Sequence, residues 1–163
     1  IGLAINTNNT EIVNSRLVGG LDPLAYCTGD NDYNNQTACE SGGETWKDDT
    51  KHNIENNLPK IRLTATVNHE INQNLSAMAR VNYYGGTIDE QGGREEVDAI
   101  QLIDLELNYR LSGNMSVVFG VNNALNTYPT HTTGRVSQGM PYPRRTPIGY
   151  HGGMMFTRLT YNF

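Results

Sequence analysis

Apolar and polar residues alternate over long stretches of the chain, and this pattern limits what the chain can fold into. Residues 61–71 read IRLTATVNHEI, with an apolar residue at almost every second position. Similar stretches run over residues 75–84, 101–111, 115–121 and 154–163. Because successive side chains of a strand point to opposite faces, each stretch is predicted to be a strand with one apolar and one polar face.

The charged side chains of these stretches all fall on the polar face. They are Arg62, Glu70, Arg80, Asp104, Glu106, Arg110 and Arg158. Asp104 and Glu106, two positions apart, have a spacing that acid–base chemistry could use, but they sit among Arg62, Arg80 and Arg110. We therefore interpret this face as the wall of a water-filled lumen, and we expect its charges to pair across strands. The apolar exceptions on this face are Met78, Leu102, Val118 and Phe156.

The lengths of the strands and of their connections favour a membrane barrel. The alternating stretches are about ten residues long, whereas an ordinary globular strand has about five or six, and ten tilted residues span the hydrocarbon of a bilayer. Residues 72–74 and 112–114 are tight turns, while 14–57, 85–99 and 126–147 are long polar connections. Short turns at one rim and long loops at the other are the plan of outer-membrane barrels.

Aromatic residues fall near the predicted strand ends. Tyr83, Tyr84, Tyr128 and Tyr150 lie toward the long loops, and Tyr109, Tyr161 and Phe163 lie toward the short turns. Two aromatic girdles at headgroup level would have this arrangement, although the β-propensity of aromatic residues also explains it.

The predicted fold class is therefore all-β, with antiparallel transmembrane strands. About six strands are expected, near residues 1–12, 60–71, 75–85, 99–111, 114–124 and 148–163. Since the smallest membrane barrels have about eight strands, either more chain precedes residue 1 or several chains assemble. We favour the first alternative, in which residues 1–163 are the C-terminal segment of a larger barrel. No run of about 18 apolar residues, as a transmembrane helix needs, occurs in the sequence.

Charge and cysteine content narrow the function classes. The net charge of -5 argues against a nucleic-acid binder, which needs a basic surface. Cys27 and Cys39 lie in a hydrated stretch and are predicted to form a disulfide in an oxidising compartment, the alternative being two free thiols. No second cysteine pair is present for a zinc site, and neither a cofactor nor a resident metal is predicted.

Two segments resemble outer-membrane proteins of bacteria. Residues 119–129, FGVNNALNTYP, resemble a segment of the form GVxNLxDxxY near the end of TonB-dependent receptors. Gly120, Val121, Asn123, Leu125 and Tyr128 match this pattern, while Asn126 stands where aspartate is frequent. Residues 58–85 and 100–123 resemble the two hairpins of that family that precede it, so the resemblance covers 58–163 well and 1–57 only through residues 10–12.

The end of the sequence resembles the C-terminal signal that the outer-membrane assembly machinery recognises. Its apolar row consists of Met155, Thr157, Leu159, Tyr161 and Phe163. We predict that this row serves as the assembly signal of the barrel.

The family resemblance implies a nutrient-uptake receptor in the outer membrane of a Gram-negative bacterium. TonB-dependent receptors are 22-stranded barrels with an N-terminal plug, and they take up ferric siderophores, haem, cobalamin or oligosaccharides. Energy reaches them through the TonB complex, which pulls on the plug. The plug and the first barrel strands have no counterpart in this sequence. The implied partners are membrane lipid, lipopolysaccharide, the assembly machinery and a small-molecule ligand, and the protein is not expected to be an enzyme.

Exposed aromatic and basic residues of the long loops are candidate ligand contacts. They are Trp46, His131, Arg135, Tyr142, Arg144 and Arg145. Plain solvation, or contact with anionic lipopolysaccharide, is the alternative for each. The spacing of Asp30, Asp32 and Asn34 imitates a calcium loop, but Asn35 and Ser41 stand where glycine and glutamate belong, so a hydrated loop is preferred.

Two other functions remain open at this point. A passive pore or adhesin-type barrel would lack the plug and the energy coupling. A soluble all-β binding domain, such as a lectin sandwich, would bury the apolar rows in a core and dissolve without detergent. Strands of about ten residues argue against this last alternative.

Overall fold

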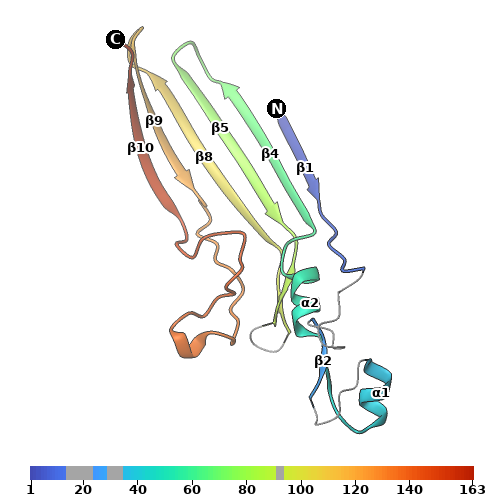
Figure 1. Ribbon diagram of the computed structural model, residues 1–163. Coiled ribbons are helices and arrows are strands. Elements are labelled where there is room, and N and C mark those ends of the chain that lie inside the picture. The colour runs from blue at the N-terminus through green and yellow to red at the C-terminus, as the bar shows by residue number, and fades with distance from the viewer. Residues whose placement is uncertain (14–23, 29–34, 91–93) are drawn as a thin grey trace.

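The computed structural model is built around one antiparallel sheet, with short helices and hairpins beyond one of its ends (Figure 1). It describes residues 1–13, 24–28, 35–90 and 94–163. The six strands follow the order β1-β4-β5-β8-β9-β10. Their bounds are Gly2–Thr7 (β1), Ile61–Glu70 (β4), Leu75–Tyr84 (β5), Ile100–Arg110 (β8), Met115–Asn122 (β9) and Met154–Tyr161 (β10). Every strand of the sheet thus pairs with its predecessor along the chain, as in an up-and-down barrel.

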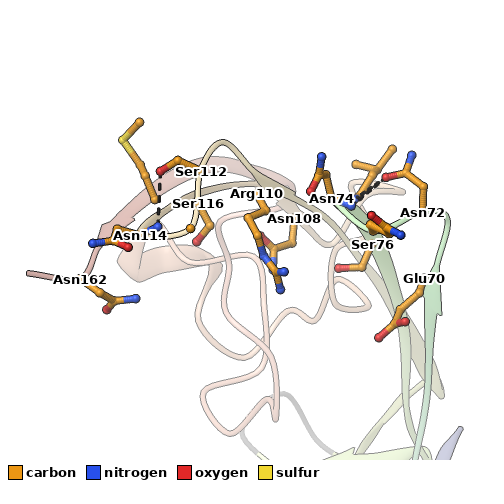
Figure 2. Close-up of a pocket in the computed structure, with 14 residues that line it drawn as sticks. Glu70, Asn72, Asn74, Ser76, Asn108, Arg110, Ser112, Asn114, Ser116 and Asn162 are labelled. Atoms are coloured by element: carbon orange, nitrogen blue, oxygen red, sulfur yellow. Dashed lines mark hydrogen bonds between the residues drawn. The ribbon is translucent and has the colours of Figure 1, made fainter.

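The register carries the alternation across the whole sheet. Leu105 of β8 lies between Ala79 of β5 and Val121 of β9, so the apolar rows of neighbouring strands are adjacent. Figure 2 shows Asn108 and Arg110 on the concave side of the curved sheet. The apolar rows therefore cover the convex side, where they are exposed. The expected antiparallel strands with one apolar and one polar face are confirmed.

The two tight turns lie at the same end of the sheet, as predicted (Figure 1). In the β4–β5 turn, Asn72 Oδ1 accepts hydrogen bonds from the backbone N–H groups of Asn74 (2.9 Å) and Leu75 (3.0 Å). In the β8–β9 turn, Ser112 Oγ accepts one from the N–H of Asn114 (3.4 Å). Asparagine and serine favour such turns because their side chains satisfy backbone donors that leave the ladder.

The long connections contain more structure than the sequence predicted. Their described residues form two short hairpins, β2 with β3 and β6 with β7, and three helices. The bounds are Tyr26–Cys27 (β2), Gln36–Ser41 (α1), Trp46–Lys47 (β3), Asp49–Asn56 (α2), Thr87–Asp89 (β6), Glu95–Val97 (β7) and Val136–Gln138 (η2). These pieces are too short to carry a periodic signal. No helix of the described residues is long and apolar enough to cross a membrane.

Two strands are shorter than predicted. β1 ends at Thr7 rather than near residue 12, because Thr7 pairs with Ile61, where β4 begins. The preceding Pro59 has no N–H with which to extend the ladder. β10 begins at Met154 rather than near 148 because Gly152 has a positive φ of 59° and turns the chain out of the sheet direction.

The described part of the sheet is open. β1 and β10 each pair with a single strand of this sheet, so their outer edges have no neighbouring strand. Exposed edges of long strands are prone to pair with other chains, and closure into a barrel removes them.

The prediction that charged side chains pair across strands on the polar face is wrong for the residues that the structure describes. Arg80 lies opposite Asp104 in register, but the carboxylate of Asp104 accepts its hydrogen bonds from two asparagines instead. The guanidinium of Arg62 lies 5.8 Å from the ring centre of Tyr84. The salt bridges found between described residues lie in the loops.

Candidate functional site

The loop between β9 and β10 is tied to the β6–β7 hairpin by its threonines. Thr130 Oγ1 donates to Asp98 Oδ2 (3.1 Å), and the backbone N–H of Asp98 donates to Thr130 Oγ1 (3.0 Å). Thr132 Oγ1 donates to Asp89 Oδ2 at 3.2 Å, and Thr132 itself is buried. These contacts join segments from two different long loops.

A third threonine completes this connection. Glu95 of β7 accepts hydrogen bonds from the backbone N–H (2.6 Å) and the hydroxyl (2.5 Å) of Thr133. The side-chain bond from Thr133, and then its backbone bond, stabilise the carboxylate and lower the pKa of Glu95 below its ordinary value of 4.5. The link therefore depends on an ionised carboxylate.

The helix α2 is connected to the β6–β7 hairpin by charged groups. Arg94 forms ion pairs with Asp48, with Asp49 (3.5 Å) and with Glu90 (3.3 Å), and Glu90 also contacts the His52 ring. The hydrogen bond to Asp48 is the main cause that raises the pKa of Arg94 above its ordinary value. Three separate connections of the sheet are thus joined into one assembly at the long-loop end.

Aromatic rings gather within the β9–β10 loop. The ring of Tyr142 is stacked on those of Tyr128 (centroids 6.2 Å apart, interplanar angle 10°) and Tyr150 (5.7 Å, 11°). His131 meets Tyr142 edge-on at 5.0 Å. The hydroxyl of Tyr150 donates to the carbonyl of Pro143 at 2.9 Å. We call Tyr128, His131, Tyr142 and Tyr150 the aromatic cluster; its rings come from the start, the middle and the end of the loop.

The structure brings only some of the predicted ligand contacts together. His131 and Tyr142 belong to the aromatic cluster, and Arg144 and Arg145 follow Tyr142 closely in the chain and are exposed. Arg145 Nη1 also donates to Asn53 Oδ1 of α2 (2.7 Å).

Arg135 and Trp46 lie elsewhere. Arg135 precedes η2, and its carbonyl accepts from the N–H groups of Gln138 (2.9 Å) and Met140 (3.2 Å). Trp46 pairs with Cys27 in the β2–β3 hairpin. A ligand role for all six predicted residues stays a prediction.

The aromatic cluster includes two residues that the ligand prediction missed. Tyr128 and Tyr150 were assigned only to the rim of the barrel, since they are 22 positions apart and no local pattern relates them. Their proximity to the strand ends was the one available signal.

The predicted disulfide is present in the structure. Cys27 of β2 and Cys39 of α1 are bonded, with their Cα atoms 5.8 Å apart, and Cys39 is fully buried. Glu44 Oε2 lies 2.9 Å from Cys27 Sγ. These three side chains could hold a metal ion by their spacing alone, but both sulfurs are engaged in the disulfide. The calcium-like residues Asp30, Asp32 and Asn34 lie outside the described residues.

A second, polar region lies at the opposite end of the sheet. It is a hollow of about 660 Å³. Figure 2 shows its lining residues on the concave side, beside the tight turns. Its lining is mostly amides and hydroxyls, with Glu70 and Arg110 as its charged residues. Such a surface offers hydrogen bonds to water or to a polypeptide, without an apolar cavity for a small ligand.

The predicted assembly row lies on the edge strand of the sheet. Met155, Leu159 and Tyr161 of β10 are exposed on the convex side, and the ring of Phe163 meets that of Tyr161 edge-on at 5.0 Å. Its role as an assembly signal stays a prediction.

Comparison with known proteins identifies the fold. No family model and no curated protein matches the chain. A solved variant of the ferric enterobactin receptor of Pseudomonas aeruginosa is similar, with a TM-score of 0.53 and 20% identity over 65% of this chain and 17% of the receptor. A second variant of that receptor has a TM-score of 0.49 and 20% identity, over 65% of this chain and 16% of the receptor. The ferric-catecholate import receptor Fiu of E. coli has a TM-score of 0.47 and 15% identity, over 64% of this chain and 14% of that receptor.

The likeness with the TM-score of 0.53 confirms the predicted fold. The sheet has the fold of part of a receptor β-barrel, and the chain spans 17% of the length of that receptor.

Proposed function

We propose that the chain forms part of the wall and of the outer loops of an outer-membrane receptor that takes up ferric siderophores. The observation that carries this proposal is the division of one curved sheet into an exposed apolar convex face and a polar concave face. Among the convex residues, Leu105 is 44% exposed, Phe119 56% and Leu159 64%. Exposed rows of this kind require an apolar medium, and membrane hydrocarbon provides one. The names of the similar receptors support the siderophore class.

The long-loop end would capture the ligand outside the cell. Stacked tyrosine rings bind planar groups, and the guanidinium groups of Arg144 and Arg145 bind oxyanions. Ferric siderophores can present both kinds of group. The carboxylate links between the loops would hold the aromatic cluster above the mouth of the barrel, so that capture costs little ordering of the loops.

The concave face would line the lumen of a larger barrel. The open edges of β1 and β10 fit strands that other parts of the protein would supply. In TonB-dependent receptors, which the sequence resembles, a plug fills that lumen and the TonB complex moves it. The polar hollow beside the turns is suited to such a polypeptide because it offers amide and hydroxyl partners. Transport of this kind makes and breaks no covalent bond, so no catalytic residue is proposed.

The remaining partners follow from the same placement. The convex face would contact lipid, and the outer-loop arginines would also contact lipopolysaccharide. The disulfide fits the oxidising side of the membrane, where such bonds persist.

Uptake by cells tests the proposal. The intact protein is expressed in an iron-limited Gram-negative strain that lacks its own catecholate receptors, and the uptake of radioactive ferric enterobactin is measured. We expect uptake that stops when TonB is absent, and that falls at least about tenfold when Tyr142→Ala is combined with Arg144→Ala, the equivalent of about 1.4 kcal/mol of binding. Lys60→Ala, on an exposed loop residue away from the aromatic cluster, is the matched control.

The rival functions give different results. A passive pore would admit small solutes without TonB, and a soluble binding domain would leave the membrane fraction without detergent. Either result would exclude the proposed receptor. Uptake of a different TonB-dependent nutrient, with no uptake of ferric enterobactin, would overturn the siderophore class alone.

A further inference from the structure

A line of hydrogen bonds crosses the concave face near its long-loop end. Thr64 Oγ1 of β4 donates to Asn82 Oδ1 of β5 (3.0 Å), and Asn82 Nδ2 donates to Asp104 Oδ2 of β8 (3.1 Å). The other oxygen of Asp104, Oδ1, accepts from the backbone N–H of Asn123 at 3.0 Å. We call Thr64, Asn82, Asp104 and Asn123 the wall relay. It connects three strands to the first residue after β9.

Asn123, the last member of the relay, shapes the start of the β9–β10 loop. It is 8% exposed and has a positive φ of 50°. Its side chain closes a turn on Thr127, donating from Nδ2 to the carbonyl (2.7 Å) and accepting at Oδ1 from the N–H (2.9 Å). The N–H of Asn126 donates to the Asn123 carbonyl at 2.8 Å. The position of Asn123 therefore sets the direction in which the loop leaves the sheet, five residues before Tyr128.

Asp104 is the member of the relay that fixes Asn123 to the wall. The backbone N–H of Asn123 is in a buried residue and takes Asp104 as its acceptor, and a buried donor without an acceptor is costly. Arg80 lies directly opposite Asp104 in register, yet it forms no ion pair with this carboxylate. Glu106, two residues along the same face, has no hydrogen bond to the loop in the described part of the chain. Of the two carboxylates of β8, Asp104 therefore bonds the start of the β9–β10 loop and Glu106, within the described residues, does not.

We propose that Asp104 is a positioning residue, which sets the pose of the ligand-binding β9–β10 loop from inside the barrel wall. The proposal rests on the proposed function only in calling this loop ligand-binding. Since the carboxylate faces the lumen, a polar group in the lumen that took Oδ1 would release the N–H of Asn123 and loosen the loop. The relay therefore connects what occupies the lumen with the pose of the aromatic cluster.

An exchange of two side chains tests the relay. Asp104→Ala removes both acceptor oxygens, so the backbone N–H of Asn123 loses its acceptor in the wall. In the double variant Asn82→Asp with Asp104→Asn, the amide at 104 donates to the carboxylate at 82 and still accepts from Asn123. The net charge equals that of the wild type, and every contact has a donor and an acceptor. Glu106→Gln is the matched control for the loss of one lumen carboxylate.

Trypsin provides the measurement, because the loop carries Arg135, Arg144 and Arg145. The intact protein in outer-membrane preparations is digested, and cleavage after each arginine is followed by mass spectrometry. Cleavage of a transiently open loop follows its open population. We expect Asp104→Ala to raise cleavage after these arginines at least about tenfold, as one lost hydrogen bond to a charged group would. Glu106→Gln should leave it unchanged, and the double variant should keep it within about twofold of the wild-type rate.

The same digests distinguish positioning from a general loss of stability. Cleavage after Lys47, in the β2–β3 hairpin of a different long loop, should stay at the wild-type rate in all variants. The proposal is overturned if Asp104→Ala leaves loop cleavage unchanged, if all sites accelerate together, or if the double variant does not keep the wild-type rate. Should Asp104→Ala not assemble, Asn82→Asp alone sets one carboxylate against another and is expected to loosen the loop equally. No siderophore enters this assay, so its outcome is independent of the uptake test.

Discussion

Replacing Leu105 with arginine tests which side of the sheet faces hydrocarbon. Leu105 lies near the middle of β8, an 11-residue strand, between Ala79 and Val121 on the convex side. An arginine on the lipid side of a barrel at mid-depth costs about 2–4 kcal/mol, whereas the cost near the interface is about 0–1 kcal/mol. The unfolding equilibrium of Leu105→Arg should therefore shift by about 30- to 700-fold.

The depth dependence of this cost can be calculated from the strand. Tyr109 lies on the same face, four residues nearer the turns. At a rise of about 3.3 Å per residue and a tilt of about 40°, it lies roughly 10 Å closer to the interface. The apolar band of such barrels is about 25 Å tall, so this displacement brings Tyr109 close to its edge. Tyr109→Arg should then cost only about 0–1 kcal/mol.

Reversible unfolding of the intact protein in lipid vesicles, with guanidinium as denaturant, measures these free energies. Glu106→Arg is the matched control, because Glu106 is the next residue along the strand and points into the polar concave side. We expect it to cost much less than Leu105→Arg. If Leu105→Arg proved neutral while Glu106→Arg cost several kcal/mol, the two faces would have been assigned the wrong way round.

Three further predictions concern packing, pH and the disulfide. Gly120→Val should cost about 1–3 kcal/mol of unfolding free energy, because a Cβ at Gly120 would lie 2.1 Å from Cζ of Phe156. The Glu95 carboxylate should hold Thr133 above about pH 4.5 and release it as the pH falls through its lowered pKa, which the amide resonance of Thr133 would report. Cys27→Ser should remove about 3 kcal/mol of local stability in the chain-entropy picture, and hydrogen exchange of α1 measures this loss.

Each of these predictions has a control or a contrary outcome. Gly113→Val should be nearly neutral, since a Cβ there has nothing within 4 Å. Glu95→Gln should abolish the acid transition, and a transition that persists would assign it to another group. Maleimide should label Cys39 only after reduction, and labelling of the unreduced protein would contradict the disulfide.

The sequence by itself determined the strands of the sheet and their two faces. Side chains alternate along a strand for local steric reasons, so burial leaves a period of two that can be read without any partner. The structure has β5 over Leu75–Tyr84 where the alternation predicted 75–85, and β4 over Ile61–Glu70 where it predicted 60–71. The tight turns were equally readable, because asparagine and serine satisfy neighbouring backbone groups.

Only the tertiary structure decided how the long loops contact one another and which groups bond to the carboxylate of Asp104. Thr132 and its partner Asp89 are 43 residues apart, and the rings of the aromatic cluster come from both ends of a long loop. Contacts at such separations depend on where the sheet places the loop ends, and no periodicity encodes them. Charge pattern alone paired Asp104 with arginine, whereas the fold gave it Asn82 and Asn123. The reason is geometric: a carboxylate bonds the donors that the backbone brings within reach and in line, whatever charges lie nearby.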